Sequence, residues 1–434
     1  MIKFLKNQTP VRLIAGGFLL VILLGSGLLM LPISLNDGVK LSYIDSLYTA
    51  VSAVCVTGLS TVEVGATFSV FGRIVLGALI QIGGLGVATV GAGFIMLMGK
   101  KMDLKSRNLV YEAMNLDSGK GVIRFLKEVF FTTLIIEAVG AILSFIVFVQ
   151  EFEWYKALGY SVFHAVSAFN NAGFDIFGRG DSLIPYQSSL MLNIVTCALI
   201  ILGGIGFLVI REMRTKGFKL RKYSMHAKVV LLMTLILLVA GTLLIKLTEG
   251  NDISWLGAFF ASVTARTAGF STFAFGNFTK AGLMVMMSLM FIGASSGSTG
   301  GGIKTTTFFV IIKSIIAAVK KGDVRIFKYS IPKETYKKAT VIAFIGVFVV
   351  ALSTFFMTLF EPNIAFLDLL FEMVSAFATV GLSTGITPEL SAGAKIVSMA
   401  VMYIGRIGPL TVVSLWSFGR PSSVRYPDGN LAIG

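Results

Sequence analysis

The sequence Thr57-Gly58-Leu59-Ser60 recurs three more times in related form, each time as a small residue, a glycine, a bulky apolar residue and a polar one. The other copies are Ala172-Gly173-Phe174-Asp175, Ala268-Gly269-Phe270-Ser271 and Val380-Gly381-Leu382-Ser383. The four glycines lie 115, 96 and 112 residues apart. A single glycine usually marks a turn or close packing, but four at similar spacing indicate four copies of one structural unit.

A short apolar stretch precedes each of these glycines. The first, second and fourth copies carry Ser-Ala six residues before the glycine, and in the third copy Ser262 is offset by one. Stretches such as 43–56 and 366–379 hold about a dozen residues, which is too few to cross a bilayer. An apolar segment of this length between two spans predicts a re-entrant half-helix.

The composition excludes an ordinary soluble domain, because 55% of the 434 residues are apolar and only 14% are charged. The mean hydropathy of +0.85 points the same way. We expect eight spans, two per repeat: 11–31, 70–98, 125–149, 188–210, 227–247, 281–319 with an interruption, 338–360 and 394–418. The first is too long for a typical signal sequence and lacks its cleavage site, so we expect it to be retained.

The predicted fold is an all-α polytopic membrane protein. Each repeat would consist of a helix, a re-entrant half-helix, a glycine loop and a second helix, and the four repeats would run parallel around a pseudo-fourfold central pore. Irregular backbone at membrane depth is tolerated only inside protein or beside water, which favours a pore-lining place for the glycine loops. The expected repeat boundaries are 1–105, 106–218, 219–325 and 326–434, the last including a C-terminal tail.

Charge placement predicts the orientation in the cell membrane. If the N-terminus and the segments 100–128, 211–228, 313–338 and 420–428 lie on one side, that side holds 27 of the 37 Lys and Arg residues. The positive-inside rule then places both termini in the cytoplasm. The basic loops would contact anionic lipids or dock a cytosolic partner, and we expect no nucleic-acid partner.

The sequence offers no constellation for catalysis, so we expect no enzyme activity and no cofactor in this chain. The two histidines and the two cysteines fall in different repeats, without the spacing of a metal site or a disulfide framework. The stretch 297–305 superficially resembles a phosphate loop, but Ile303 separates the last glycine from Lys304 and breaks the motif.

Four glycine loops around one axis could present backbone carbonyl oxygens to a dehydrated cation, as the filters of potassium channels do. The candidate filter segments are 54–58, 169–173, 265–269 and 377–381. The candidate ion-binding residues, with potassium at their backbone carbonyls, are Val56, Thr57, Gly58, Asn171, Ala172, Gly173, Thr267, Ala268, Gly269, Thr379, Val380 and Gly381. The alternative interpretation is four tight turns that only end amphipathic helices.

A second glycine motif follows each filter segment, at 82–86, 202–206, 292–294 and 404–408. Small residues allow close helix packing, which explains most of this motif. Arg406 within the fourth copy is a costly intramembrane charge that predicts either permeation control or a structural ion pair, with Asp45 or Glu372 as partners. Glu137 is also intramembrane, and for it we expect interhelical hydrogen bonding.

Ten small residues interrupt the sixth span at 293–302 and are followed by Lys304. Glycine and serine at this density do not hold a regular helix, so the span must break into two half-helices joined by a loop. A loop beneath a filter could act as a gate, held by hydrogen bonds to Arg406. The candidate gating residues are Gly293, Ala294, Ser295, Ser296, Gly297, Ser298, Thr299, Gly300, Gly301, Gly302, Lys304 and Arg406.

In these features the sequence resembles the Trk/Ktr/HKT superfamily of cation transporters, and most of all the bacterial Ktr membrane subunit. The resemblance covers the whole chain and rests on the four filter segments, on the small-residue loop ending in Ile303-Lys304, on 404–409 and on the tail 425–429. It implies a homodimer with one pore per subunit and potassium uptake down the electrochemical gradient. It also implies control by a cytosolic ring of RCK-type nucleotide-binding subunits.

By matching position, the resemblance makes Gly58, Gly173, Gly269 and Gly381 the filter glycines, 293–304 the gating loop and Arg406 the arginine below the filter. Some relatives that favour sodium carry serine at the first filter glycine, so Gly58 favours potassium. The alternative function is an alternating-access secondary cation transporter, sodium-coupled or sodium-permeable. Such transporters usually have inverted repeats, whereas these repeats are predicted to be parallel.

Overall fold

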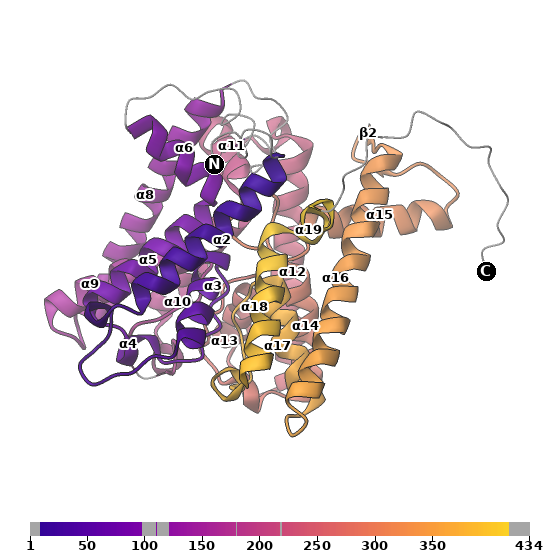
Figure 1. Cartoon of the computed structure of the whole chain (residues 1–434). Coiled ribbons are helices and arrows are strands. Elements are labelled where there is room, and N and C mark those ends of the chain that lie inside the picture. The colour runs from indigo at the N-terminus through magenta and orange to yellow at the C-terminus, as the bar shows by residue number, and fades with distance from the viewer. Residues whose placement is uncertain (1–8, 98–109, 111–120, 179, 218, 416–434) are drawn as a thin grey trace.

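The computed structural model describes residues 9–97, 110, 121–178, 180–217 and 219–415 (Figure 1). Within these residues the chain is mostly helical, which confirms the all-α prediction, and the exception is a short hairpin of β1 (Arg325–Ile326) and β2 (Tyr329–Ser330). Most of the basic segment 100–128 and the tail 425–429 used above lie outside the described residues.

Four helices are each long and apolar enough to cross a membrane alone: α2 (Pro10–Leu29), α8 (Val122–Phe148), α12 (Met225–Glu249) and α16 (Lys333–Phe360). Their outward faces are apolar, since Leu134, Leu247 and Phe344 are 66%, 78% and 73% exposed. Exposed leucine and phenylalanine at this density are expected of a surface that contacts lipid rather than water.

A shorter helix follows each of these four: α3 (Tyr43–Cys55), α9 (Trp154–Phe169), α13 (Trp255–Thr264) and α17 (Phe366–Ala378). The observed ends of α3 and α17 lie within one residue of the predicted half-helices 43–56 and 366–379. Both helices end in a left-handed residue, Val56 or Thr379, which turns the chain sharply into the glycine loop.

The second apolar span predicted for each repeat is broken in the structure. The prediction of continuous spans at 70–98, 188–210 and 394–418 is therefore wrong. They divide into α5 (Val70–Leu85) with α6 (Val87–Leu97), α10 (Leu190–Ile205) with α11 (Phe207–Lys216), and α18 (Ala392–Ile407) with α19 (Pro409–Ser414). The breaks fall at Gly86, Gly206 and Gly408, whose φ values of 85°, 91° and 96° are incompatible with an α-helix.

The first two of these bends reach 101°. In the third copy α14 (Lys280–Phe291) and α15 (Thr305–Val319) flank the predicted small-residue loop. The eight predicted spans thus become four complete ones in the described residues, or six if each 101° pair counts as one.

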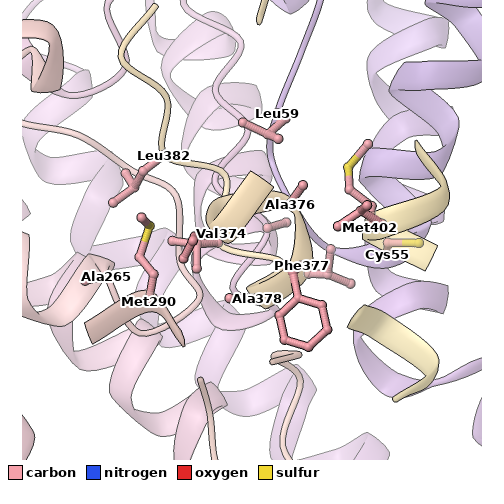
Figure 2. Close-up of a cluster of buried hydrophobic side chains, with 14 of the residues drawn as sticks. Cys55, Leu59, Ala265, Met290, Val374, Ala376, Phe377, Ala378, Leu382 and Met402 are labelled. Carbon is pink, nitrogen blue, oxygen red and sulfur yellow. The ribbon is translucent and has the colours of Figure 1, made fainter. Parts of the chain in front are cut away.

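The remaining elements are single turns that shape the loops: α4 (Val64–Thr67), η1 (Pro32–Ser34), η2 (Ile184–Tyr186), η3 (Leu220–Lys222), η4 (Phe275–Asn277) and η5 (Thr387–Glu389). The core lies where the short helices end. Figure 2 shows side chains from distant parts of the chain meeting there, among them Cys55, Ala265, Met290 and Phe377. The long helices surround this centre, with α16 and α15 at one side of the bundle (Figure 1).

Candidate functional site

The four glycine loops contact one another in a closed cycle. A Cβ atom on Gly58 would come within 3.0 Å of the carbonyl oxygen of Ala172 in the second loop, too close for a real side chain. The same relation holds from each loop to the next, and the last returns to the first: Gly173 to Ala268, Gly269 to Val380, and Gly381 to Thr57. The structure therefore brings the predicted filter residues of all four loops together in a ring around one centre.

Each loop repeats one backbone conformation. The glycines have φ values of 96°, 69°, 82° and 92°, and the residues two positions earlier are also left-handed, at 57° for Val56, 59° for Asn171, 74° for Thr267 and 51° for Thr379. The residue between them has no positive φ. Because left-handed non-glycine residues cost about 1–3 kcal/mol each, the surrounding contacts must impose this shape.

The backbone amides of the loops bond back to the short helices. Thr57 N–H donates to the carbonyl oxygen of Ser52 at 2.8 Å, and Gly58 N–H donates to the Ser52 hydroxyl at 3.0 Å. The fourth loop repeats this with Ser375, at 2.9 Å from Val380 N and 3.1 Å from Gly381 N. Among the described residues, no hydrogen bond reaches the carbonyl oxygens of the predicted ion-binding residues.

The third loop uses a different support. Ser262, the offset serine, donates to Leu238 of α12 at 3.0 Å and does not touch the loop amides. Instead, Thr264 Oγ1 donates to the carbonyl oxygen of Phe270 at 2.6 Å, as Ser167 Oγ does to Phe174 at 2.8 Å in the second loop. The functional equivalent of the serine is thus a threonine two residues later, which the Ser-Ala pattern did not reveal.

Two polar residues beside the ring escaped the sequence analysis. Arg266 lies in the third segment, is 6% exposed and contacts Thr234 of α12. Asn170 follows α9, and its amide donates to Gln81 at 2.7 Å and to Glu137 at 3.0 Å. The interhelical hydrogen bonding expected for Glu137 is confirmed, and it fixes the second loop against α5 and α8. Both residues could have been noticed in the sequence, because a charged or amide side chain is unusual within an otherwise apolar filter segment.

We expect Ser375→Ala to destabilise the fourth loop. The side chain is fully buried, so its loss leaves the Gly381 N–H without an acceptor, at a cost of about 1–3 kcal/mol. Thermal unfolding of the purified protein should shift to lower temperature, and stabilisation by added potassium should shrink. Ser288→Ala is the control, because that serine is exposed and bonds only within α14. Equal melting temperatures and equal potassium dependence of the two variants would contradict this role of Ser375.

The small-residue loop 293–302 lies directly against the ring. Gly301 N–H donates to Thr379 Oγ1 at 3.0 Å, and Thr299 Oγ1 donates to the carbonyl oxygen of Phe169 at 3.3 Å. A Cβ on Gly300 would collide with Thr267. The loop therefore touches the second, third and fourth filter segments at once, on the side toward which the short helices end.

The loop is also tied to the α10–α11 break. Ser295 N–H donates to Gly204 O at 3.0 Å, and Phe207 N–H donates to Gly297 O at 3.1 Å. Its base is closed by a backbone bridge between Ile292 and Ile303 and by the hydroxyls of Ser295 and Thr305, 3.0 Å apart. The tip could thus move or be shortened while the base stays joined.

Two cationic side chains, Lys304 and Arg406, donate hydrogen bonds to carbonyl oxygens of the loop. Lys304 Nζ donates to Gly300 O at 2.6 Å and to Gly301 O at 3.3 Å. Arg406 donates to the carbonyl oxygen of Thr299 and, across the site, to those of Gly83 and Gly84 at the end of α5. Arg406 thereby clamps the loop to another part of the chain.

The predicted pairing of Arg406 with Asp45 or Glu372 is wrong. Asp45 forms an ion pair with Lys395 at 2.7 Å, and Glu372 accepts from Thr387 at 2.5 Å. The loop carbonyls replace the expected carboxylate because the broken helix leaves its backbone oxygens without intrahelical donors.

The close helix packing expected of the second glycine motif is seen at the first glycine of three of its copies. A Cβ on Gly83 would collide with the carbonyl oxygen of Val54, one on Gly203 with that of Phe169, and one on Gly405 with that of Phe377. The helices α5, α10 and α18 can therefore lie against the ends of the short helices only because these positions have no side chain.

Acidic residues gather on the opposite side of the ring. Asp175 follows the second loop, and burial raises its pKa to about 6, with the nearby charges of Glu63 and Asp181 acting in the same direction. A carboxylate here attracts cations toward the ring when it is ionised.

We expect the initial rate of cation entry at low cation concentration to fall as the pH on this side drops through about 6. Below that pH Asp175 carries a proton, and this side of the ring loses one negative charge. The decrease should be roughly threefold, a small part of the steering that a whole charged cleft provides. Flux into liposomes at graded pH tests this, and Asp175→Asn should remove the step. An unchanged pH profile in Asp175→Asn would assign the step to another group.

Comparisons with known proteins agree on one family. A family model described as TrkH, cation transport protein, matches residues 14–424. The chain is 42% identical to the Ktr system potassium uptake protein B of Bacillus subtilis (strain 168), over 98% of this chain and 97% of that protein. It is 38% identical to the potassium/sodium uptake protein NtpJ of Enterococcus hirae, over 99% and 98%. Its fold matches the crystal structure of the potassium transporter TrkH from Vibrio parahaemolyticus, with a TM-score of 0.73, 17% identity and coverage of 93% and 85%.

Proposed function

This chain belongs to the TrkH family of cation transport proteins, and from that premise we propose that it is the pore-forming subunit of a Ktr-type potassium uptake system in the cell membrane. The family consists of cation transporters, not of enzymes. Two relatives that match over nearly their full length are Ktr system potassium uptake proteins by name. Potassium is thus the substrate we assign, and we assign no cofactor to this chain.

The observation that carries the proposal is the closed cycle of the four glycine loops. We propose that the chain forms four parallel repeats, bounded at 1–105, 106–218, 219–325 and 326–434, with the short helices α3, α9, α13 and α17 re-entrant around a central pore. Unpaired carbonyl oxygens from four equivalent loops would replace the hydration shell of a potassium ion. Glycine is required at these positions because a side chain would collide with the next loop. Its left-handed backbone gives each loop the conformation that places the carbonyl oxygens.

The loop 293–302 is the proposed gate. It contacts three filter segments and is held by Lys304 and Arg406 through its own carbonyl oxygens. Two cationic side chains beneath the ring also oppose the passage of a cation as long as they stay there. Displacement of the loop would remove the obstruction and carry Lys304 away with α15.

We further propose a homodimer that is opened by a cytosolic ring of RCK-type nucleotide-binding subunits, with both termini of this chain in the cytoplasm. The Ktr relatives are described as members of a system, which favours a partner subunit. The half-helix α15 leads from the gate to the basic region 313–338 and is the element that a partner could pull.

The alternative is a secondary transporter that couples potassium to sodium, or admits sodium. It is favoured by one specific observation, the potassium/sodium uptake protein among the relatives. The two functions differ in whether potassium moves alone or together with sodium. A passive pathway moves potassium without sodium on the same side, whereas coupled transport requires it.

Flux measurements in liposomes with the purified protein test the proposed function. We expect potassium uptake down its gradient in the absence of sodium, and an increase when the cytosolic subunit is added. Uptake that stops without sodium would establish the coupled alternative. No uptake of either ion, with a folded protein and partner present, would contradict the assignment as a pore-forming subunit.

A further inference from the structure

A cavity of about 250 Å³ lies between α8 and α11. Arg124 of α8 and Arg211 and Arg214 of α11 line its polar part. It has room for roughly eight waters at ~30 Å³ each, which is enough for a phosphate group and its ester substituents. We propose that this cavity binds the headgroup of an anionic phospholipid.

The charges in the cavity favour an anion. Glu128 is the acidic residue of the lining, and it pairs with Arg211 at 2.9 Å and with Arg124 at 3.2 Å. Arg214 has no acidic partner among the described residues, so the part of the lining that the structure describes carries a surplus of two positive charges. Arginine binds phosphate through two parallel N–H groups, a geometry that a single lysine does not offer.

The rest of the lining selects a lipid over a free anion. Phe125, Val129, Phe207 and Ile210 form an apolar wall beside the arginines. On α8 the exposed apolar side chains begin at Phe131, which is 55% exposed and lies two turns beyond Arg124 on the same side of the helix. A headgroup at the arginines would thus have its acyl chains against the outer face of α8, as in basic pockets at the cytoplasmic ends of membrane helices.

The site is mechanically connected to the gate. The helix α11 carries two of the arginines and begins at Phe207, whose N–H holds the carbonyl oxygen of Gly297. A ligand favours the conformation in which its site is formed. A bound headgroup holds α11 against α8 and thereby favours the loop in its observed place. This consequence rests on the proposed gate, whereas the binding itself does not.

The test measures lipid binding by thermal unfolding in detergent, with phosphatidylglycerol as the probe and phosphatidylcholine as the neutral comparison. Phosphatidylglycerol should stabilise the parent, and its apparent affinity should fall roughly fivefold in Arg214→Gln and roughly a hundredfold when Arg124, Arg211 and Arg214 all become Gln. The single variant leaves the Glu128 pairs intact, so it remains informative if the triple variant does not fold. The matched controls are Lys219→Gln and the triple change of Lys219, Arg221 and Lys222 to Gln, which remove the same charge from the exposed loop beside the cavity.

Four outcomes overturn the proposal. Equal losses in the cavity and control variants would show diffuse attraction to basic residues. Equal stabilisation by phosphatidylcholine would show that the headgroup charge is irrelevant, and equal stabilisation by inorganic phosphate would assign the site to a free anion. Unchanged lipid binding with loss of the cytosolic subunit would make the cavity a protein docking surface. Because none of these measurements involves transport, a failed pore assignment leaves the test intact.

Discussion

Removal of Ser296–Gly300 should open the protein. The deleted residues carry the hydrogen bonds of the loop tip to Phe207, Phe169 and Arg406. At ~1 kcal/mol each, their loss shifts the balance between closed and open states by about 3 kcal/mol, or roughly a hundredfold. Potassium flux into liposomes should rise by a large factor, and its dependence on the cytosolic subunit should nearly disappear.

The structure indicates that this deletion is tolerated. The bridge between Ile292 and Ile303 and the contact between Ser295 and Thr305 close the base of the loop outside the deleted segment. Replacement of Ser296, Ser298 and Thr299 by glycine is the control, since it keeps the length and the backbone carbonyl that Arg406 holds. It should raise flux much less. A shortened protein that folds and dimerises but transports no faster than the parent would make the loop structural.

Gly58→Ser should relax selectivity for potassium over sodium by roughly tenfold, because selectivity depends on the number and placement of the carbonyl oxygens. The glycine has a φ of 96°, and a side chain there meets the carbonyl oxygen of Ala172 in the next loop. Both loops must shift, so half of the ring is disturbed. The measurement is the ratio of potassium to sodium uptake under identical gradients.

Gly38→Ser is the matched control for backbone strain. Gly38 has a φ of 78°, but a Cβ there would meet nothing within 4 Å. It should cost stability without altering the uptake ratio. If Gly58→Ser keeps the ratio of the parent, the first loop does not belong to the filter. If both variants lose selectivity equally, strain alone accounts for the change.

Much of the candidate site could be predicted from the sequence because its signals are local. The length of an apolar run and the glycine at its end predicted α3 and α17 to within one residue. Ten small residues in a row predicted the loop at 293–302. Such features depend on helix propensity and membrane thickness, which act on each segment separately.

Other features depend on contacts between distant segments and could not be predicted in this way. Gly83 and Gly86 belong to the same short motif, yet a Cβ on Gly83 would collide with Val54 at the end of α3, whereas Gly86 takes a φ of 85° and breaks the helix. The prediction that Arg406 pairs with Asp45 or Glu372 was wrong for a related reason. A buried charge suggests a carboxylate, but here Arg406 donates to backbone oxygens beside the breaks of two helices.

We propose that the ring of glycine loops is a passive potassium pathway closed by the loop 293–302. The most direct test is the reversal potential of the loop-shortened protein in a planar bilayer, with potassium and sodium gradients varied separately. We predict that the reversal potential follows the potassium gradient, at about 59 mV per tenfold change for a monovalent ion, and is nearly insensitive to sodium. A reversal potential that follows both gradients in a fixed ratio, or an absence of current alongside measurable uptake, would contradict the claim and favour alternating access.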